Sequence, residues 1–151
     1  MADRIPTILA IDDNPANLLA LGSALADAFD LQVATSGEAG LALAEQAQPN
    51  LILLDVMMPG LDGYATFRRL LANPRLCTIP VIFLTALHDF ESESTGLALG
   101  AADYITKPIH VEIARLRISN LLEREKLRRM VEFHRDHLER TVLQRTAQLQ
   151  D

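Results

Sequence analysis

The sequence predicts an α/β fold, a doubly wound domain built on a five-stranded parallel sheet. Apolar segments of strand length alternate five times with segments that have helical periodicity. Two of the apolar segments, residues 51–54 and 81–84, have no polar position, which is typical of strands covered on both faces in a parallel sheet. In this fold class, functional side chains gather at the carboxyl ends of the strands.

The first β-α unit begins with a strand at residues 7–11. Asn14 is a favourable residue to cap the following helix, and Pro15 suits its first position. Apolar residues then recur at helical spacing, at Leu18, Leu21, Leu25 and Phe29. This stripe is expected to face the sheet.

The second unit pairs a short strand at residues 31–34 with a helix that Ser36 caps and that ends before Pro49. The apolar positions of this helix are expected at Ala39, Leu43 and Ala47.

The remaining units follow the two fully apolar strands. Gly63 is expected to open the helix after residues 51–54. The helix after residues 81–84 is predicted at 89–99, where serine, threonine and glycine dilute the apolar positions, so we expect it to be loosely held. The last strand is predicted at 103–106.

The composition is ordinary for a globular chain, with 151 residues of which 49% are hydrophobic and 23% charged. No apolar stretch is long enough to suggest a membrane span, and the N-terminus does not resemble a signal peptide. Cys77 is the only cysteine, which excludes an internal disulfide and predicts a cytoplasmic location.

Charge is unevenly distributed along the chain. Residues 1–109 contain 13 acidic and 5 basic residues, so this part is expected to repel nucleic acid. In residues 110–151 the two signs alternate, as on a solvated helix face. We therefore expect no direct binding of nucleic acid.

Polar residues follow four of the predicted strands: Asp12 and Asp13 the first, Asp55 the third, Thr85 the fourth and Lys107 the fifth. Right-handed crossovers bring these strand ends to one edge of the sheet. Three converging carboxylates need a proton or a cation between them, and their oxygens suit Mg²⁺. Asp55 is then a candidate nucleophile that forms an aspartyl phosphate, with Lys107 and Thr85 binding the transferred oxygens.

These motifs resemble the receiver domain of bacterial two-component response regulators. The resemblance covers about residues 6–122 and rests on Asp12-Asp13, the segment LLDVMMPGLDG around Asp55, Thr85-Ala86, and Lys107-Pro108 after Tyr104. It implies a flavodoxin-like sheet with strand order 2-1-3-4-5. It also implies that Asp55 accepts a phosphoryl group from a histidine kinase or a phosphotransfer protein.

The resemblance further implies roles for the neighbouring residues. Asp12, Asp13, Asp55 and the backbone carbonyl of Met57 would bind Mg²⁺. Thr85 and Tyr104 would be switch residues, Lys107 would form a salt bridge, and the peptide bond before Pro108 would be cis. Such a domain is not an enzyme towards other molecules, since it promotes only its own phosphorylation and dephosphorylation. Enzymatic activity would belong to an output domain missing from this chain.

Each assignment has a simpler alternative. The acidic pair Asp12-Asp13 suits the start of a helix without binding metal, Tyr104 suits a fixed core position, and Asp62 suits a turn. For the whole chain, the alternative is a phosphate-independent interaction scaffold, which would incorporate no phosphate at Asp55. A hydrolase acting on an external phosphate ester is disfavoured, because Met57 stands where a second acidic residue would act as general acid.

Met57 and Leu87 lie two residues after Asp55 and Thr85. Both are apolar, and neither can orient an attacking water. The sequence therefore predicts slow loss of phosphate from Asp55.

Residues 110–151 contain no proline or glycine and predict one long helix. Leucine recurs in it at an interval of 11 residues, a period of about 3.67 residues per turn that suits a near-straight or slightly right-handed coiled coil. We expect residues 1–122 to form the receiver and residues 123–151 a homodimerisation linker towards the output domain. A frayed, solvated tail is the alternative. The expected dimer contacts are Leu116, Leu127, Val131, Leu138, Val142 and Leu149.

Overall fold

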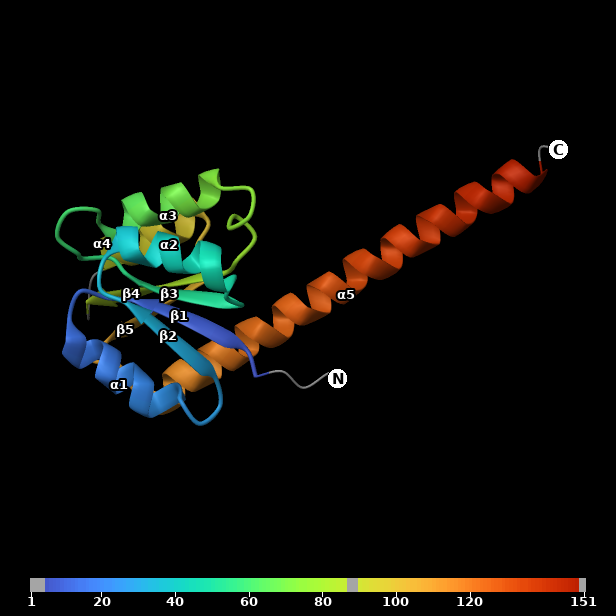
Figure 1. Ribbon diagram of the computed structural model, residues 1–151. Helices are drawn as coiled ribbons and strands as arrows, with labels where there is room; N and C mark the ends of the chain where they lie inside the picture. Colours follow the sequence, from blue (N-terminus) through green and yellow to red (C-terminus); the bar gives the residue numbers. More distant parts are fainter. Residues whose placement is uncertain (1–4, 87–89, 150–151) are drawn as a thin grey trace. The chain divides into compact units, whose positions relative to one another are not determined.

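The computed structural model describes residues 5–86 and 90–149, in which five strands alternate with five helices (Figure 1). The elements are β1 (Thr7–Ile11), α1 (Pro15–Leu25), β2 (Asp30–Ala34), α2 (Gly37–Ala47), β3 (Leu51–Asp55), α3 (Gly63–Ala72), β4 (Val81–Ala86), α4 (Phe90–Leu99), β5 (Asp103–Lys107) and α5 (Val111–Leu149). Asp89, where the fourth helix was expected to begin, lies outside the described residues, as does Leu87.

The five strands form one parallel sheet in the order β2-β1-β3-β4-β5, which confirms the predicted fold and strand order. Helix α1 lies on one face of the sheet, and α2, α3 and α4 lie on the other (Figure 1). The first turns of α5 lie on the face of α1, where Arg115 forms an ion pair with Asp27 at 3.4 Å. Both faces are covered, which explains the fully apolar strands.

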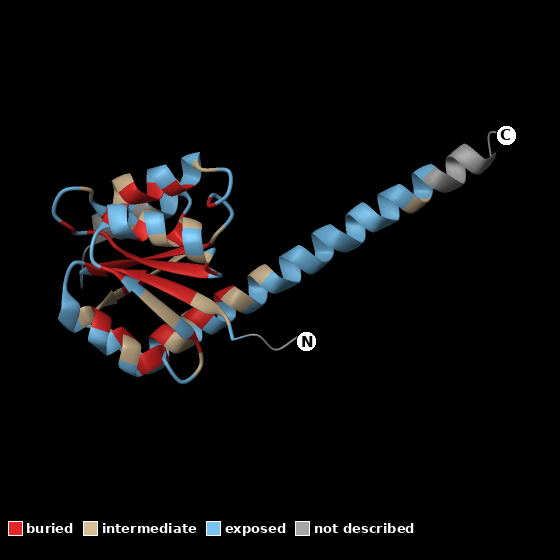
Figure 2. Cartoon of the chain, in the orientation of Figure 1, coloured by how far each residue is buried: buried red, intermediate tan, exposed pale blue. Residues whose placement is uncertain are grey.

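The core consists of the strands and the inward sides of the helices, which are buried in Figure 2. The predicted stripe of α1 is confirmed for Leu18, Leu21 and Leu25, which are buried. Phe29 is buried too, but the helix ends before it, at Leu25. Asn14 caps this helix as predicted, because its side chain accepts a hydrogen bond from the backbone N–H of Ala16 at 2.9 Å.

Helix α2 contains Ala39, Leu43 and Ala47 as expected, but other residues form its buried face. Ala39 is exposed, and Leu43 and Ala47 are only half-buried. The buried face consists instead of Gly37, Gly40 and Ala44. A β-carbon on Gly40 would overlap the side chain of Ile11, so glycine lets this helix approach β1 closely.

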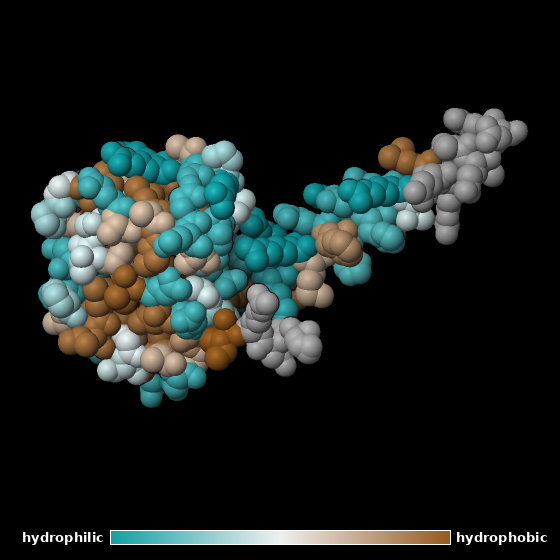
Figure 3. All heavy atoms as spheres, in the orientation of Figure 1, coloured by the Kyte–Doolittle hydropathy of each residue, from teal (hydrophilic) through white to brown (hydrophobic). Residues whose placement is uncertain are grey.

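The chain divides into two compact units, Met1–Ile118 and Ser119–Asp151, with the boundary inside α5. On the face that Figure 3 shows, the helix of the second unit is mostly hydrophilic, with a few hydrophobic groups. Seven of its described large apolar side chains are exposed: Leu127, Met130, Val131, Phe133, Leu138, Val142 and Leu143. The side chain of Leu149 lies outside the described residues. A single chain does not test the coiled coil or the boundary at residue 122, and both stay predictions. Within the described residues, no helix combines the length and the apolar character needed to cross a membrane.

Candidate functional site

The strand register brings the polar residues at the strand ends to one edge of the sheet. Ile11 lies opposite Leu54, so the residues after β1 lie beside the end of β3. Asp55 lies opposite Leu84, and Ala86 lies opposite Lys107. The sheet therefore places residues 12, 55, 85 and 107 side by side.

Three carboxylates form the centre of this site. Asp12, Asp13 and Asp55 each offer an oxygen, and these oxygens all lie within 4.8 Å of one another. Asp12 and Asp55 are buried, with exposed fractions of 0% and 3%, whereas Asp13 is exposed. Hard oxygen donors at this spacing, with one side open to solvent, fit a divalent cation such as Mg²⁺.

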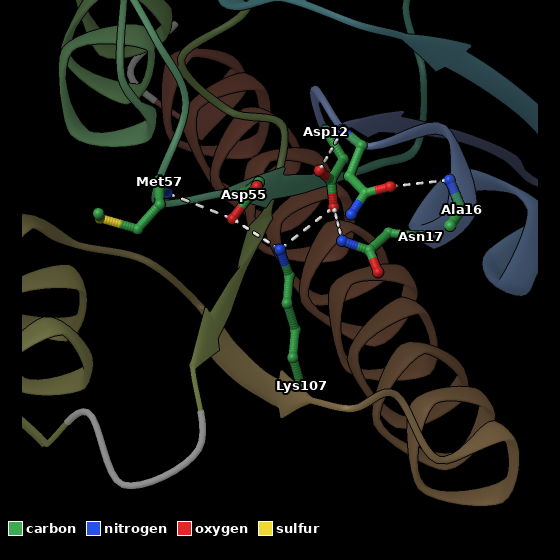
Figure 4. Close-up of polar contacts among 7 residues, drawn as sticks. Asp12, Ala16, Asn17, Asp55, Met57 and Lys107 are labelled. Atoms are coloured by element: carbon green, nitrogen blue, oxygen red, sulfur yellow. Dashed lines mark hydrogen bonds and ion pairs between the residues drawn. The ribbon is translucent and has the colours of Figure 1, made fainter.

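Lys107 reaches into the carboxylates from the end of β5 (Figure 4). Its Nζ lies 3.0 Å from Oδ1 of Asp55 and 3.4 Å from Oδ2 of Asp12. The peptide bond between Lys107 and Pro108 is cis. One cation thus contacts both buried carboxylates, which partly offsets the free energy of burying them.

The pKa of the Asp55 carboxyl group is raised from 3.8 to about 6, and burial is the largest cause. The hydrogen bond and the negative charge of Asp12 also raise the pKa, while the hydrogen bond and the positive charge of Lys107 lower it. At neutral pH Asp55 is therefore ionised, but its ionised form is unusually unstable. A buried carboxylate of this kind in a polar cluster is typical of functional sites.

Two further side chains of interest lie on β4, next to the strand of Asp55, and on β5. Thr85 is buried, and its Oγ1 has no hydrogen-bond partner among the described residues. Tyr104 is half-buried and packs against the core, while its ring lies 5.4 Å from the guanidinium carbon of Arg117. A buried hydroxyl without a partner is uncommon and indicates a place where another group can bind.

The backbone of the loop after β3 contacts the carboxylate of Asp55. The N–H of Met57 donates to Oδ1 of Asp55 at 3.2 Å, while the side chain of Met57 is exposed. A β-carbon on Gly63 would overlap the backbone of Asp55 and Val56, so this position requires glycine. Asp62 is the N-cap of α3 and accepts from the N–H of Ala65 at 2.8 Å, a structural role.

The sequence did not reveal two polar side chains of this region. Asn17 on α1 donates from Nδ2 to Oδ2 of Asp12 at 3.0 Å. Arg117 on α5 donates from Nη1 to Oδ1 of Asp103 at 2.8 Å, beside Tyr104. The sequence marks Asn17 only as a polar residue in an otherwise apolar first turn of the helix. Nothing in the sequence indicates that residues 103 and 117 form a pair.

A doubly wound sheet with an acidic cluster and a lysine at its carboxyl edge defines a class of signalling domains. Residues 8–119 match the sequence profile of the response regulator receiver domain. The chain belongs to this family.

The chain is similar to several larger proteins. It is 35% identical over 143 residues to a "Probable cyclic di-GMP phosphodiesterase" of Vibrio cholerae, a match that covers 95% of this chain and 32% of that protein. It is 43% identical over 103 residues to the response regulator PleD of Caulobacter vibrioides, covering 68% of this chain and 23% of PleD. The chain thus spans about a quarter to a third of the length of these two relatives.

Solved structures give the same classification. The receiver domain of the Francisella response regulator 1452 is 31% identical and superimposes with a TM-score of 0.72, covering 79% of this chain and 98% of that domain. The similarity therefore extends over the whole of that domain.

Proposed function

We propose that this chain accepts a phosphoryl group on Asp55 and signals through its C-terminal helix. The donor would be a histidine kinase or a phosphotransfer protein, the partners with which receiver domains interact. The observation that carries the proposal is the position of Asp55, a buried carboxylate 3.0 Å from Lys107 and surrounded by two more carboxylates. Phosphorylation would replace the single charge of this carboxylate with a more highly charged phosphoryl group, which Lys107 can bind.

In the proposed reaction, an ionised oxygen of Asp55 attacks the phosphorus of a phosphorylated histidine. The new O–P bond forms as the P–N bond breaks, and the imidazole leaves with a proton. Asp55 is ionised at neutral pH, because its pKa of about 6 lies below that value. Lys107 holds the carboxylate in place and neutralises charge on the transferred oxygens.

Asp12, Asp13 and Asp55 would hold Mg²⁺, with the carbonyl of Met57 as the fourth ligand. Mg²⁺ supplies, when bound, positive charge next to the oxygens of the transferred group. The close approach of the three carboxylates supports this proposal, since without a cation or a proton they repel one another.

The switch would use Thr85 and Tyr104. The hydroxyl of Thr85 has no partner among the described residues, so an oxygen on phosphorylated Asp55 would provide one. The ring of Tyr104 contacts Arg117 on α5, so a movement of Tyr104 would change this contact with the helix. Phosphorylation needs only a few kcal/mol of differential binding to shift such a two-state equilibrium.

The proposal is tested by incubating the chain with acetyl phosphate, with and without MgCl₂, and measuring the intact mass. We expect addition of one phosphoryl group only with MgCl₂. A chain that gains no phosphate under either condition would instead be an interaction scaffold with a receiver fold.

A Met57→Asn variant is expected to lose its phosphate several-fold faster than the unaltered chain. The side chain at this position is exposed and follows Asp55 by two residues, so an amide there can hydrogen-bond an attacking water. The decay of labelled protein in the presence of MgCl₂ measures the rate. A Met57→Leu variant, which stays apolar, is the control, and equal decay of all three proteins would refute the idea.

We propose that the C-terminal helix pairs with a second copy of the chain. Leu127, Val131, Leu138 and Val142 are exposed by half or more, and their spacing places them on one side of the helix. Such a stripe suits a two-helix seam. Leu116 and Leu149 continue the same period.

Removing residues 123–151 is therefore expected to convert a dimer into a monomer, measured by sedimentation equilibrium. A Leu138→Asp variant of the full chain should weaken the dimer by tenfold or more, on the order of 1–3 kcal/mol, because it places a charge in the seam. Leu143→Asp is the control, since position 143 lies on another side of the helix. A full chain that is monomeric at micromolar concentration would exclude the coiled coil.

We propose that the helix leads to an output that acts on a cyclic dinucleotide. The match to the Vibrio cholerae protein covers 95% of this chain, so it extends into the helix beyond the receiver. A cytoplasmic location fits such an output and its kinase partner. Because receiver domains are typically not enzymes, turnover would belong to the output.

A further inference from the structure

Asn17 contacts the acidic site from the first turns of α1. Its Nδ2 donates to Oδ2 of Asp12 at 3.0 Å (Figure 4). Asp12 is fully buried and Asn17 is half-buried, so this hydrogen bond is partly shielded from solvent. A hydrogen bond to a buried carboxylate is stronger than one at the surface.

The contacts of Asp12 leave little freedom to its carboxylate. Oδ1 accepts from the backbone N–H of Asn14 at 2.9 Å, and Oδ2 accepts from Asn17 and lies 3.4 Å from Nζ of Lys107. An ionised carboxylate has about four lone-pair positions. These three groups, together with Asp55, which also contacts the carboxylate of Asp12, restrict the lone pairs that are open to a metal ion.

The χ2 torsion of an aspartate, which rotates its carboxylate, has no sharp preference. The orientation of the Asp12 carboxylate therefore depends on the groups that contact it. Of these groups, Asn17 is the only neutral side chain. A second cation at this place would repel a metal ion, whereas the amide orients Asp12 without adding charge.

Asn17 is not needed to start the helix. The side chain of Asn14 already caps α1 through the N–H of Ala16 at 2.9 Å, and Pro15 occupies the first position. The side-chain hydrogen bond of Asn17 to Asp12 therefore serves the site rather than the helix end.

We infer that Asn17 is a positioning residue of the metal site, which fixes the Asp12 carboxylate in the orientation that a divalent cation requires. This inference rests on the proposed function, in which Asp12, Asp13 and Asp55 bind Mg²⁺. Groups that hydrogen-bond to a metal ligand commonly change metal affinity by about 10–100-fold when removed.

The test is binding of Mn²⁺, a divalent cation that also takes carboxylate ligands, to the unphosphorylated 151-residue chain. Free Mn²⁺ is measured by electron paramagnetic resonance. Asn17→Leu keeps the approximate shape of the side chain but removes the donor, and we expect its Kd for Mn²⁺ to rise by about tenfold or more. Asn17→Ala is a second variant without the donor, for use if the leucine prevents folding as judged by circular dichroism.

Asn14→Ala is the matched control. It removes the cap of the same helix but keeps the backbone N–H that donates to Asp12, so its Kd should stay within about twofold of the unaltered chain. Acetyl phosphate labelling gives a second readout: the Mg²⁺ concentration for half-maximal rate should rise in Asn17→Leu, while the rate at saturating Mg²⁺ changes little.

Three results would overturn the inference. Either folded Asn17 variant could bind Mn²⁺ as tightly as the unaltered chain, or Asn14→Ala could weaken binding equally, which would assign the effect to the helix. The third result is that the unaltered chain does not bind Mn²⁺, which would refute the proposed metal site itself. Titration of the unaltered chain therefore separates failure of the metal site from failure of the role of Asn17.

Discussion

An Asp55→Asn variant is expected to incorporate no phosphate from acetyl phosphate, a loss of ~100-fold or more relative to the unaltered chain. The substitution keeps the shape of the side chain but replaces the nucleophilic carboxylate by an amide. Lys107 would still lie near Asp12, at 3.4 Å, so the fold of the site should remain. The measurement is intact mass after incubation with MgCl₂.

Asp62→Asn is the matched control for this experiment. Asp62 lies in the same loop and caps α3 through the N–H of Ala65, a role that asparagine can also fill. Its labelling should equal that of the unaltered chain. Phosphate on Asp55→Asn at an unchanged level would place the acceptor elsewhere, with the exposed Asp13 as the first residue to examine.

Most of the fold could be predicted from sequence, because strand burial and helix starts are local signals. The apolar residues 51–54 and 81–84 and the pair Asn14-Pro15 each report on their own element. The inward face of α2 could not be predicted in this way. On that face Gly40 contacts Ile11, which lies 29 positions earlier in the chain. Glycine has no side chain, so a pattern of apolar side chains does not reveal this contact.

The convergence of Asp12, Asp55 and Lys107 could also be predicted, because parallel strands bring their carboxyl ends to one edge. The groups that support these residues could not. Asn17 reaches Asp12 only because of the way α1 packs on the sheet, and Arg117 meets Asp103 only because α5 returns beside β5. Such contacts depend on tertiary geometry, which a pattern of residue types does not contain.

The unaltered chain is expected to lose about 2 kcal/mol of stability, relative to Asp55→Asn, as the pH rises from about 4 to about 7 without divalent cations. In the folded chain burial raises the pKa of Asp55 from 3.8 to about 6. Between these values the folded state binds more protons than the unfolded state. Stability from the protonated form is therefore fully present below the lower value and is lost as the pH rises through the upper one.

The measurement is urea denaturation of both proteins at a series of pH values in EDTA. Carboxyl groups away from the site titrate alike in the two proteins, so the difference between their free energies of unfolding reports on Asp55 and on Asp12, with which it interacts. Asp62→Asn should follow the unaltered chain across the whole range. A difference that does not change with pH would mean that Asp55 titrates near 3.8 in the folded protein.

The same destabilisation connects the stability of the chain to its proposed chemistry. Because ionised Asp55 destabilises the fold at neutral pH, a cation that neutralises this carboxylate should stabilise the folded chain. Addition of MgCl₂ at pH 7 should therefore stabilise the unaltered chain more than Asp55→Asn, by an amount that rises with the logarithm of one plus the ratio of Mg²⁺ concentration to Kd. Equal stabilisation of both proteins would show that the buried charge of Asp55 does not contribute to metal binding.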